Sequence, residues 1–267
     1  MGTIRRAVID VGTNSVKLLV ADVSGREVTP LHEESRQTRL GKGFYETHQL
    51  QPEPIARTAE AVWEFGEIAR EWNAASIRVI ATSAARDAVN PRDLTHSIER
   101  ASGLKTEIIT GAREAELAFL GVATHPELAQ QPLLLLDVGG GSTEFILGQG
   151  QKKHFAHSFP LGTVRLMEKF PHSDPPAKTE FDACRDWLKK FLRHEVRPQL
   201  EPALQQEQGA IQLVGTGGTT SILARIDLKL ERFDRQRIEG ARLSLAQVKA
   251  HRNQLWSLPL AERKQVT

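Results

Sequence analysis

Short apolar runs alternate with helix-like patterns along this chain. Residues 7–12 and 16–20 are apolar runs typical of buried strands, and a third strand is predicted from Val28. Three strands in succession predict an antiparallel meander. The following segments predict helices at residues 52–72, 91–101 and 114–122, and strands at residues 77–81 and 106–109. This alternation indicates an α/β layer with parallel strand pairing.

The opening segment recurs in the middle of the chain. Residues 9–15 match residues 136–142, so that Asp10 corresponds to Asp137, 127 positions later. Each copy continues into an apolar strand. A repeat of domain length predicts two similar domains rather than an array of short units. The predicted domains are residues 1–124 and residues 125–267.

The second half predicts strands at residues 153–159 and 211–214 and a long amphipathic helix at residues 179–196. Further helices are predicted from about Ser221 and after Ser244. This half has fewer elements than a full copy of the first half would need. We therefore expect the second domain to be incomplete at its C-terminal end.

Composition narrows the class of protein. Of 267 residues, 40% are hydrophobic and 25% are charged, as in ordinary folded domains. The net charge is +2, and no run of Lys and Arg predicts a nucleic-acid-binding arm. Cys184 is the only cysteine, which excludes an intramolecular disulfide. The N-terminal apolar run breaks at Asp10, so we expect neither a signal peptide nor a membrane segment and predict a cytoplasmic protein.

Three loops combine glycine with hydroxyl residues, and each follows a predicted buried strand. Glycine lets the backbone approach a ligand closely, and exposed N–H groups together with Ser and Thr hydroxyls form an anion site. The third loop also leads into a helix, whose N-terminus favours negative charge. Most glycine-rich turns are only turns, but three in one chain predict phosphate binding. The candidate phosphate-binding residues are Gly12, Thr13, Asn14, Ser15, Gly139, Gly140, Gly141, Ser142, Thr143, Gly217, Gly218 and Thr219.

Asp10 and Asp137 lie at the ends of the strands that lead into the first two loops. A carboxylate beside a phosphate is unfavourable unless a cation lies between them, and Mg²⁺ typically uses one or two carboxylates together with phosphate oxygens. We therefore expect metal ligation, with a structural Asx turn as the alternative. Glu144 follows the second loop at the position that Lys17 holds in the first copy. Strand alternation alone does not decide whether Glu144 faces the cleft or solvent.

Residue type alone does not show whether two arginines and two glutamates have a functional role. Arg86 follows a predicted strand, and Arg165 ends the segment 160–165; arginine suits bidentate contacts with phosphate. The chain has 35 Lys and Arg residues, however, and most such groups are solvated. Glu114 and Glu116 lie at the start of a predicted helix, where acidic residues are favoured in any case.

These segments together resemble the exopolyphosphatase and guanosine pentaphosphate phosphatase family, within the superfamily of sugar kinases, actin and heat-shock chaperones. The similar segments occur in family order and cover nearly the whole chain. They are residues 9–15, 81–88, 111–115, 137–144, 160–165 and 215–220.

The resemblance implies an α/β fold of two actin-like domains, of ribonuclease H-like topology, with a central cleft between them. It implies that Glu114 orients or deprotonates the attacking water. Asp137 and Glu144 are implied to be acidic residues needed for activity, and with Asp10 they form the expected site for Mg²⁺ or another divalent cation. Arg86 and Arg165 are implied to lie near the phosphate path.

The sequence therefore predicts a phosphohydrolase that removes the terminal phosphate of inorganic polyphosphate. Guanosine pentaphosphate is the alternative substrate. A non-catalytic nucleotide or polyphosphate sensor is less consistent with the acidic residues, and a sugar or acetate kinase is less consistent with the segment 111–115. We expect a small-molecule or polyanionic substrate as the partner, without nucleic acid or membrane, and leave open whether the chain is a homodimer.

Overall fold

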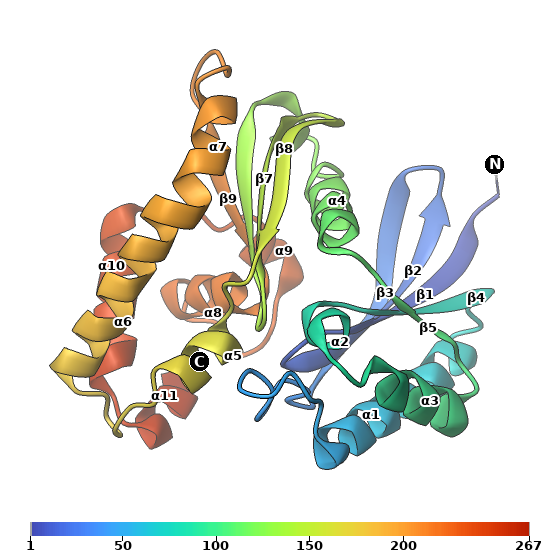
Figure 1. Ribbon diagram of the computed structural model, residues 1–267. Helices are drawn as coiled ribbons and strands as arrows, with labels where there is room; N and C mark the ends of the chain where they lie inside the picture. Colours follow the sequence, from blue (N-terminus) through green and yellow to red (C-terminus); the bar gives the residue numbers. More distant parts are fainter. Residues whose placement is uncertain (1, 267) are drawn as a thin grey trace.

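The first half of the chain folds on a mixed sheet of five strands in the order β3-β2-β1-β4-β5. The computed structural model describes residues 2–266 (Figure 1). β1, β2 and β3 form the expected antiparallel meander. β4 and β5 join parallel to β1, because helices connect β3 to β4 and β4 to β5. The strands are β1 (Ile4–Val11), β2 (Ser15–Ser24), β3 (Glu27–Gln37), β4 (Ser76–Ala81) and β5 (Thr106–Ile108).

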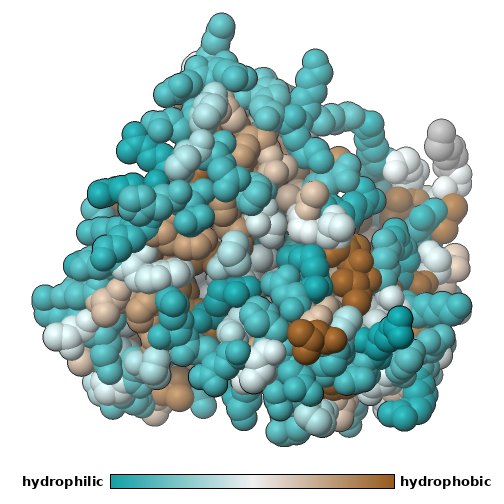
Figure 2. Space-filling model, viewed as in Figure 1, coloured by the Kyte–Doolittle hydropathy of each residue, from teal (hydrophilic) through white to brown (hydrophobic). Residues whose placement is uncertain are grey.

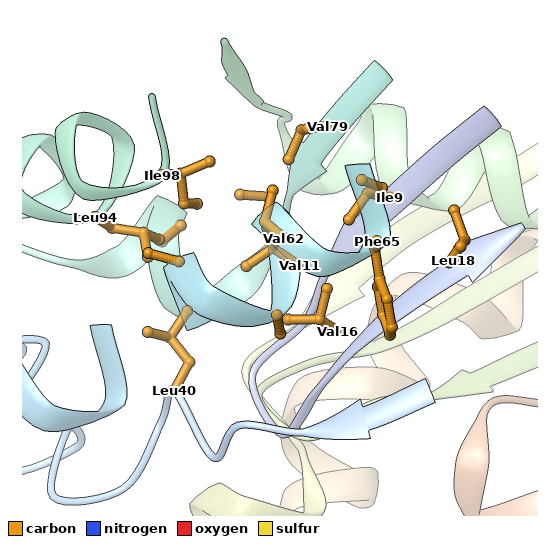
Figure 3. Packing of buried hydrophobic residues seen from close by; sticks show 14 of the residues in the cluster. Ile9, Val11, Val16, Leu18, Leu40, Val62, Phe65, Val79, Leu94 and Ile98 are labelled. Atoms are coloured by element: carbon orange, nitrogen blue, oxygen red, sulfur yellow. The ribbon is translucent and has the colours of Figure 1, made fainter. Parts of the chain in front are cut away.

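Two helices pack against this sheet and against each other, α1 (Pro52–Glu71) and α3 (Pro91–Ser102). Each begins with a proline, which suits the first turn because an N–H there has no helical partner. Figure 3 shows the resulting core, where Ile9 and Leu18 of the sheet lie with Phe65 of α1. A short helix that the sequence did not predict, α2 (Ser83–Asp87), follows β4 directly.

The second half repeats this arrangement with four strands in the order β8-β7-β6-β9. β6 pairs antiparallel with β7 and parallel with β9, and β7 pairs antiparallel with β8. The order equals that of β3-β2-β1-β4, so the internal repeat found in the sequence is a structural repeat. The strands are β6 (Leu133–Val138), β7 (Thr143–Gln149), β8 (Lys152–Phe159) and β9 (Gln212–Thr216).

Helices lie against the second sheet through two separate apolar clusters. One cluster joins Phe119 of α4 to Leu135 and Ile146 of the sheet. The other joins Phe145 and Phe159 to the long helical segment formed by α6, a π-helical turn η2 and α7. This segment is longer than the single helix predicted at residues 179–196. The helices are α4 (Gly111–Val122), η1 (Leu128–Gln130), α5 (Thr163–Lys169), α6 (Lys178–Phe191), η2 (Leu192–Val196), α7 (Arg197–Leu204), α8 (Gly218–Asp227), α9 (Arg235–Glu239), α10 (Leu245–Ser257) and α11 (Leu260–Val266).

Helix α4 precedes the predicted domain boundary at residues 124 and 125 but packs on the second sheet. It contacts β8, β7 and β6, and Figure 1 shows it beside β8. Any residue on α4 is therefore positioned by the second half of the molecule. The boundary and the incompleteness of the second domain stay predictions.

The outer surface is largely hydrophilic. Figure 2 shows hydrophilic residues over most of one face, with a hydrophobic patch near the junction of the two halves. None of the helices formed by residues 2–266 has the length and apolar character that crossing a bilayer requires.

Candidate active site

The first two glycine loops form the same turn. The backbone N–H of Gly12 donates to the carbonyl of Ser15, and that of Gly139 donates to the carbonyl of Ser142, each at 3.0 Å. A Cβ atom would lie 3.1 Å from the Ser15 oxygen at Gly12 and 2.9 Å from the Ser142 oxygen at Gly139. The tight turn in each copy thus requires glycine because of a close backbone approach.

The two loops meet across the junction between the halves. A Cβ at Gly141 would lie 2.5 Å from the Ser83 hydroxyl, 2.6 Å from the Thr13 hydroxyl and 2.7 Å from the Tyr45 hydroxyl. Gly140 also approaches Thr13. Residues that lie far apart in the sequence therefore come together here, as the paired loops predict.

The third loop crosses the end of β6. Gly217 has φ of 90°, and a Cβ there would lie 2.9 Å from Oδ1 of Asp137. Gly218 and Thr219 form the first turn of α8. Thr143, by contrast, is buried, and its hydroxyl donates to the carbonyl of Leu161, inside the second half. Its hydroxyl is therefore engaged within the second half, and a phosphate contact of Thr143 stays a prediction.

Glu114 lies in the first turn of α4 and pairs with Arg86 of α2. Nη1 of Arg86 donates to Oε2 of Glu114 at 2.8 Å and to the carbonyl of Ile109 at 3.3 Å. The Arg86 and Glu114 side chains are 22% and 18% exposed, so the pair is mostly withdrawn from water but open to a ligand. Thr110 caps the N-terminus of α4, and its hydroxyl accepts the N–H of Arg113 at 3.2 Å.

A pocket of about 370 Å³ lies beside this pair, which is a volume typical of small-molecule sites. It lies at the junction of the halves, because its walls come from α2, from the start of α4, from the second glycine loop and from β8. The lining residues are Arg86, Asp87, Gly111, Ala112, Ser142, Ala156, His157, Ser158 and Pro160.

Four carboxylates act on one another next to the glycine loops. Burial and, to a smaller extent, the Glu114 carboxylate raise the pKa of Glu144 to about 8, although the hydrogen bond from Ser158 opposes the rise. Burial also raises the pKa of Glu114, against the hydrogen bond from Arg86. Glu144 is 1% exposed, so it faces inward rather than toward solvent.

The pKa values of Asp10 and Asp137 are also raised. Burial raises the pKa of both carboxyls, and the Lys17 ammonium opposes the rise at both. The Asp137 carboxylate adds to the rise at Asp10. Asp10 and Asp137 therefore lie near each other and near Lys17, although they come from different halves.

The fit to a metal ion is partial. Oδ1 of Asp10 is buried and has no hydrogen-bond partner, which leaves an oxygen for a cation or its water. In the described part of the chain, however, no three Asp, Glu, His or Cys side chains are arranged as a metal-binding group. The set Asp10, Asp137 and Glu144 stays a prediction, and these residues suit an ion such as Mg²⁺ that keeps water and takes phosphate oxygens.

Arg165 of α5 is engaged at the junction of the halves. Its Nε donates to the carbonyl of Gly141 at 3.0 Å, its Nη2 lies 3.3 Å from Oδ2 of Asp87, and its guanidinium lies 4.2 Å from the centre of the Tyr45 ring. Glu168, one turn later, accepts the backbone N–H of Tyr45 at 3.1 Å. Helix α5 thus ties the second half to the first.

Sequence reasoning missed several residues of this site. Ser158 donates to Oε1 of Glu144 at 2.6 Å, and Lys17 lies beside Asp10 and Asp137. Lys17 occupies the position equivalent to Glu144, so the repeat itself was a signal for it. Nothing in the local sequence marks Ser158.

Comparison with known proteins shows to which family the chain is similar. The model of the Ppx/GppA phosphatase family matches residues 19–266. A protein of Mycobacterium tuberculosis named Exopolyphosphatase 2 is 38% identical over 255 residues, which cover 91% of this chain and 77% of the relative.

Two solved structures are also similar. An exopolyphosphatase from Cytophaga hutchinsonii has a TM-score of 0.85 at 30% identity, over 98% of this chain and 83% of that one. The Ppx/GppA enzyme of Aquifex aeolicus has a TM-score of 0.76 at 30% identity, over 99% of this chain and 84% of that one. The expected α/β fold with two actin-like domains is confirmed. The chain belongs to the Ppx/GppA phosphatase family.

Proposed function

We propose that the chain is a cytoplasmic exopolyphosphatase that hydrolyses the terminal phosphoanhydride of inorganic polyphosphate. The observation that carries this proposal is the Arg86–Glu114 ion pair, because Arg86 lines a pocket that Ser142 of the second glycine loop also lines. The relatives named as exopolyphosphatases support the choice of substrate.

In this proposal, a water molecule attacks the terminal phosphorus, and Glu114 accepts a proton from that water. The bond between that phosphorus and the bridging oxygen breaks, and phosphate leaves together with a chain one unit shorter. Such a reaction depends mainly on positioning and on charge neutralisation. The hydrogen bonds of Arg86 in residues 2–266 use Nη1 alone, so its Nη2 donors are left for a phosphate oxygen.

The backbone N–H groups of the glycine loops add further donors. They hold the phosphate oxygens in place and take up negative charge as it develops. Asp10 and Asp137, with Glu144 behind them, would hold Mg²⁺ or another divalent cation. That ion would neutralise phosphate charge.

The test is a side-by-side assay of phosphate release from inorganic polyphosphate and from guanosine pentaphosphate, with and without Mg²⁺. We expect release from polyphosphate with the higher kcat/KM. Faster turnover of guanosine pentaphosphate would make that compound the substrate. Tight binding of both compounds with release from neither would identify a sensor and refute the proposed hydrolase.

A further inference from the structure

The hydroxyl hydrogen of Ser158 is committed to Glu144. The two residues lie directly opposite each other in the β7–β8 pair, so their side chains project to the same face of the sheet as close neighbours. Oγ of Ser158 donates to Oε1 of Glu144 at 2.6 Å. A neutral carboxyl also offers a carbonyl oxygen as acceptor, so this hydrogen bond does not require a charge on Glu144.

The same hydroxyl keeps its lone pairs, which can accept hydrogen bonds. A serine hydroxyl carries one donor hydrogen and two acceptor lone pairs. Ser158 is half-buried and lines the pocket beside the Arg86–Glu114 pair. A group in the pocket that bonds to this oxygen must therefore donate a hydrogen to it. A water molecule can do so, whereas an unprotonated phosphate oxygen cannot.

The first residue of α4 brings Ser158 next to the proposed base. A Cβ at Gly111 would lie 2.6 Å from Cβ of Ser158, 3.0 Å from its Oγ and 3.8 Å from Cζ of Arg86. The hydroxyl and the guanidinium therefore flank the same point, which a side chain at position 111 would fill. Arg86 donates to Glu114 at 2.8 Å, and the Glu114 carboxylate acts electrostatically on Glu144. Ser158 and Glu114 thus border one small region.

The other polar side chains of the pocket are less suited to accept from water. The Arg86 guanidinium can only donate. Asp87 already accepts from Arg165 at 3.3 Å. The ring of His157 packs against an aromatic ring of the same strand, with 4.4 Å between the ring centroids. Ser158 is therefore well placed to hold a water by one of its hydrogens.

We propose that Ser158 orients the attacking water, its Oγ accepting one hydrogen of the water while Glu114 takes the other as a proton. The water oxygen then directs a lone pair at the terminal phosphorus. The hydrogen on the Ser158 side is not transferred and stays on the oxygen that joins the released phosphate, while the bond from phosphorus to the bridging oxygen breaks. The inference rests on the proposed function, because it concerns the nucleophile of that hydrolysis.

The experiment compares Ser158→Ala, Glu114→Gln and the double variant with the parent protein. The control is Ser257→Ala, because the Ser257 hydroxyl donates to the Gln254 carbonyl at 2.9 Å at the end of α10, outside the pocket. Steady-state phosphate release from polyphosphate and thermal unfolding are measured on every protein. Tripolyphosphate binding is measured by calorimetry on the two proteins that carry Glu114→Gln, so that turnover does not interfere.

We expect Ser158→Ala to lower kcat by roughly ten- to hundred-fold with little change in KM, because a misplaced nucleophile reacts slowly while the phosphate contacts remain. In the Glu114→Gln background the same substitution should lower kcat much less, because both side chains act on one water. Tripolyphosphate affinity should not depend on Ser158, and Ser257→Ala should match the parent protein.

Three results would overturn the inference. An equal fold-loss of kcat in both backgrounds would show that Ser158 only supports the packing of Glu144. Weaker tripolyphosphate binding in the double variant than in Glu114→Gln would make Ser158 a substrate contact. An unchanged kcat in Ser158→Ala would leave it no part in the reaction.

The two proposals fail in distinguishable ways. If the parent protein releases no phosphate from polyphosphate or from guanosine pentaphosphate, the hydrolase fails and the role of Ser158 fails with it. If the parent protein releases phosphate and Ser158→Ala has the same kinetics, the hydrolase stands and only the role of Ser158 fails.

Discussion

Replacing Glu114 by Gln tests the proposed chemistry most directly. The substitution keeps the size of the side chain and an oxygen that can still accept from Nη1 of Arg86, now at 2.8 Å from Oε2. It removes the ability to accept a proton. General-base catalysis contributes about 10²–10⁴-fold, so we expect kcat to fall by that range, or about 3–5 kcal/mol in activation free energy.

The same change should leave the fold intact. Burial raises the pKa of Glu114, which means that the folded state disfavours its charge, and a neutral amide avoids this cost. Arg86 loses a charged partner but keeps the Ile109 carbonyl. These effects oppose each other, so we expect the free energy of unfolding to change by no more than about 1 kcal/mol. Loss of a negative charge near the substrate should maintain or tighten phosphate binding.

The assay measures phosphate release, tripolyphosphate affinity and thermal unfolding in one preparation. Glu116→Gln is the matched control, because Glu116 lies on the same helix and pairs at the surface with Arg113 at 2.7 Å. It should behave as the parent protein. Turnover of Glu114→Gln within a few-fold of the parent would refute general-base catalysis by this residue, and joint loss of folding and binding would assign it a structural role.

Three further substitutions test other parts of the site. Arg86→Lys keeps the charge but loses the planar donor pair, so kcat/KM should fall roughly ten- to hundred-fold; unchanged kinetics would exclude a bidentate phosphate contact. Gly162→Ala places a Cβ 2.3 Å from the carbonyl oxygen of Gly140, so it should lower the free energy of unfolding by about 1–3 kcal/mol or more. Urea unfolding measures this loss, and an unchanged midpoint would contradict the observed packing. The pKa of Glu144 is raised from 4.5 to about 8, so its neutral form stabilises the fold below about pH 4.5 and that contribution is lost as the pH rises toward 8. Unfolding at pH 5.5 and 8.5 should therefore show a smaller loss of stability in Glu144→Gln than in the parent, and equal losses would refute the raised pKa.

The sequence predicted those parts of the site that depend on local turn chemistry. Gly12 and Gly139 could be recognised because their turns repeat. Ser158 could not, because it meets Glu144 only through the register of β7 and β8, in which the two residues are directly opposite. Alternation of polar and apolar residues shows which face a residue is on but not which residue it faces.

Helix α4 was harder to assign for a related reason. The apolar positions Ala115 and Phe119 predict that the helix buries a face, but they do not tell which sheet it covers. That choice is made by contacts between segments far apart in the chain. The short helices α2 and α5 were missed because each has too few turns to show a helical period.

The location of α4 makes the Arg86–Glu114 pair a link between the two halves of the molecule. Arg86 lies on α2, which follows β4 of the first sheet, whereas Glu114 lies on a helix that packs on the second sheet. A rotation that parts the two halves would pull the guanidinium away from the carboxylate. The pair therefore holds the side chain of Glu114 in place from both sheets at once.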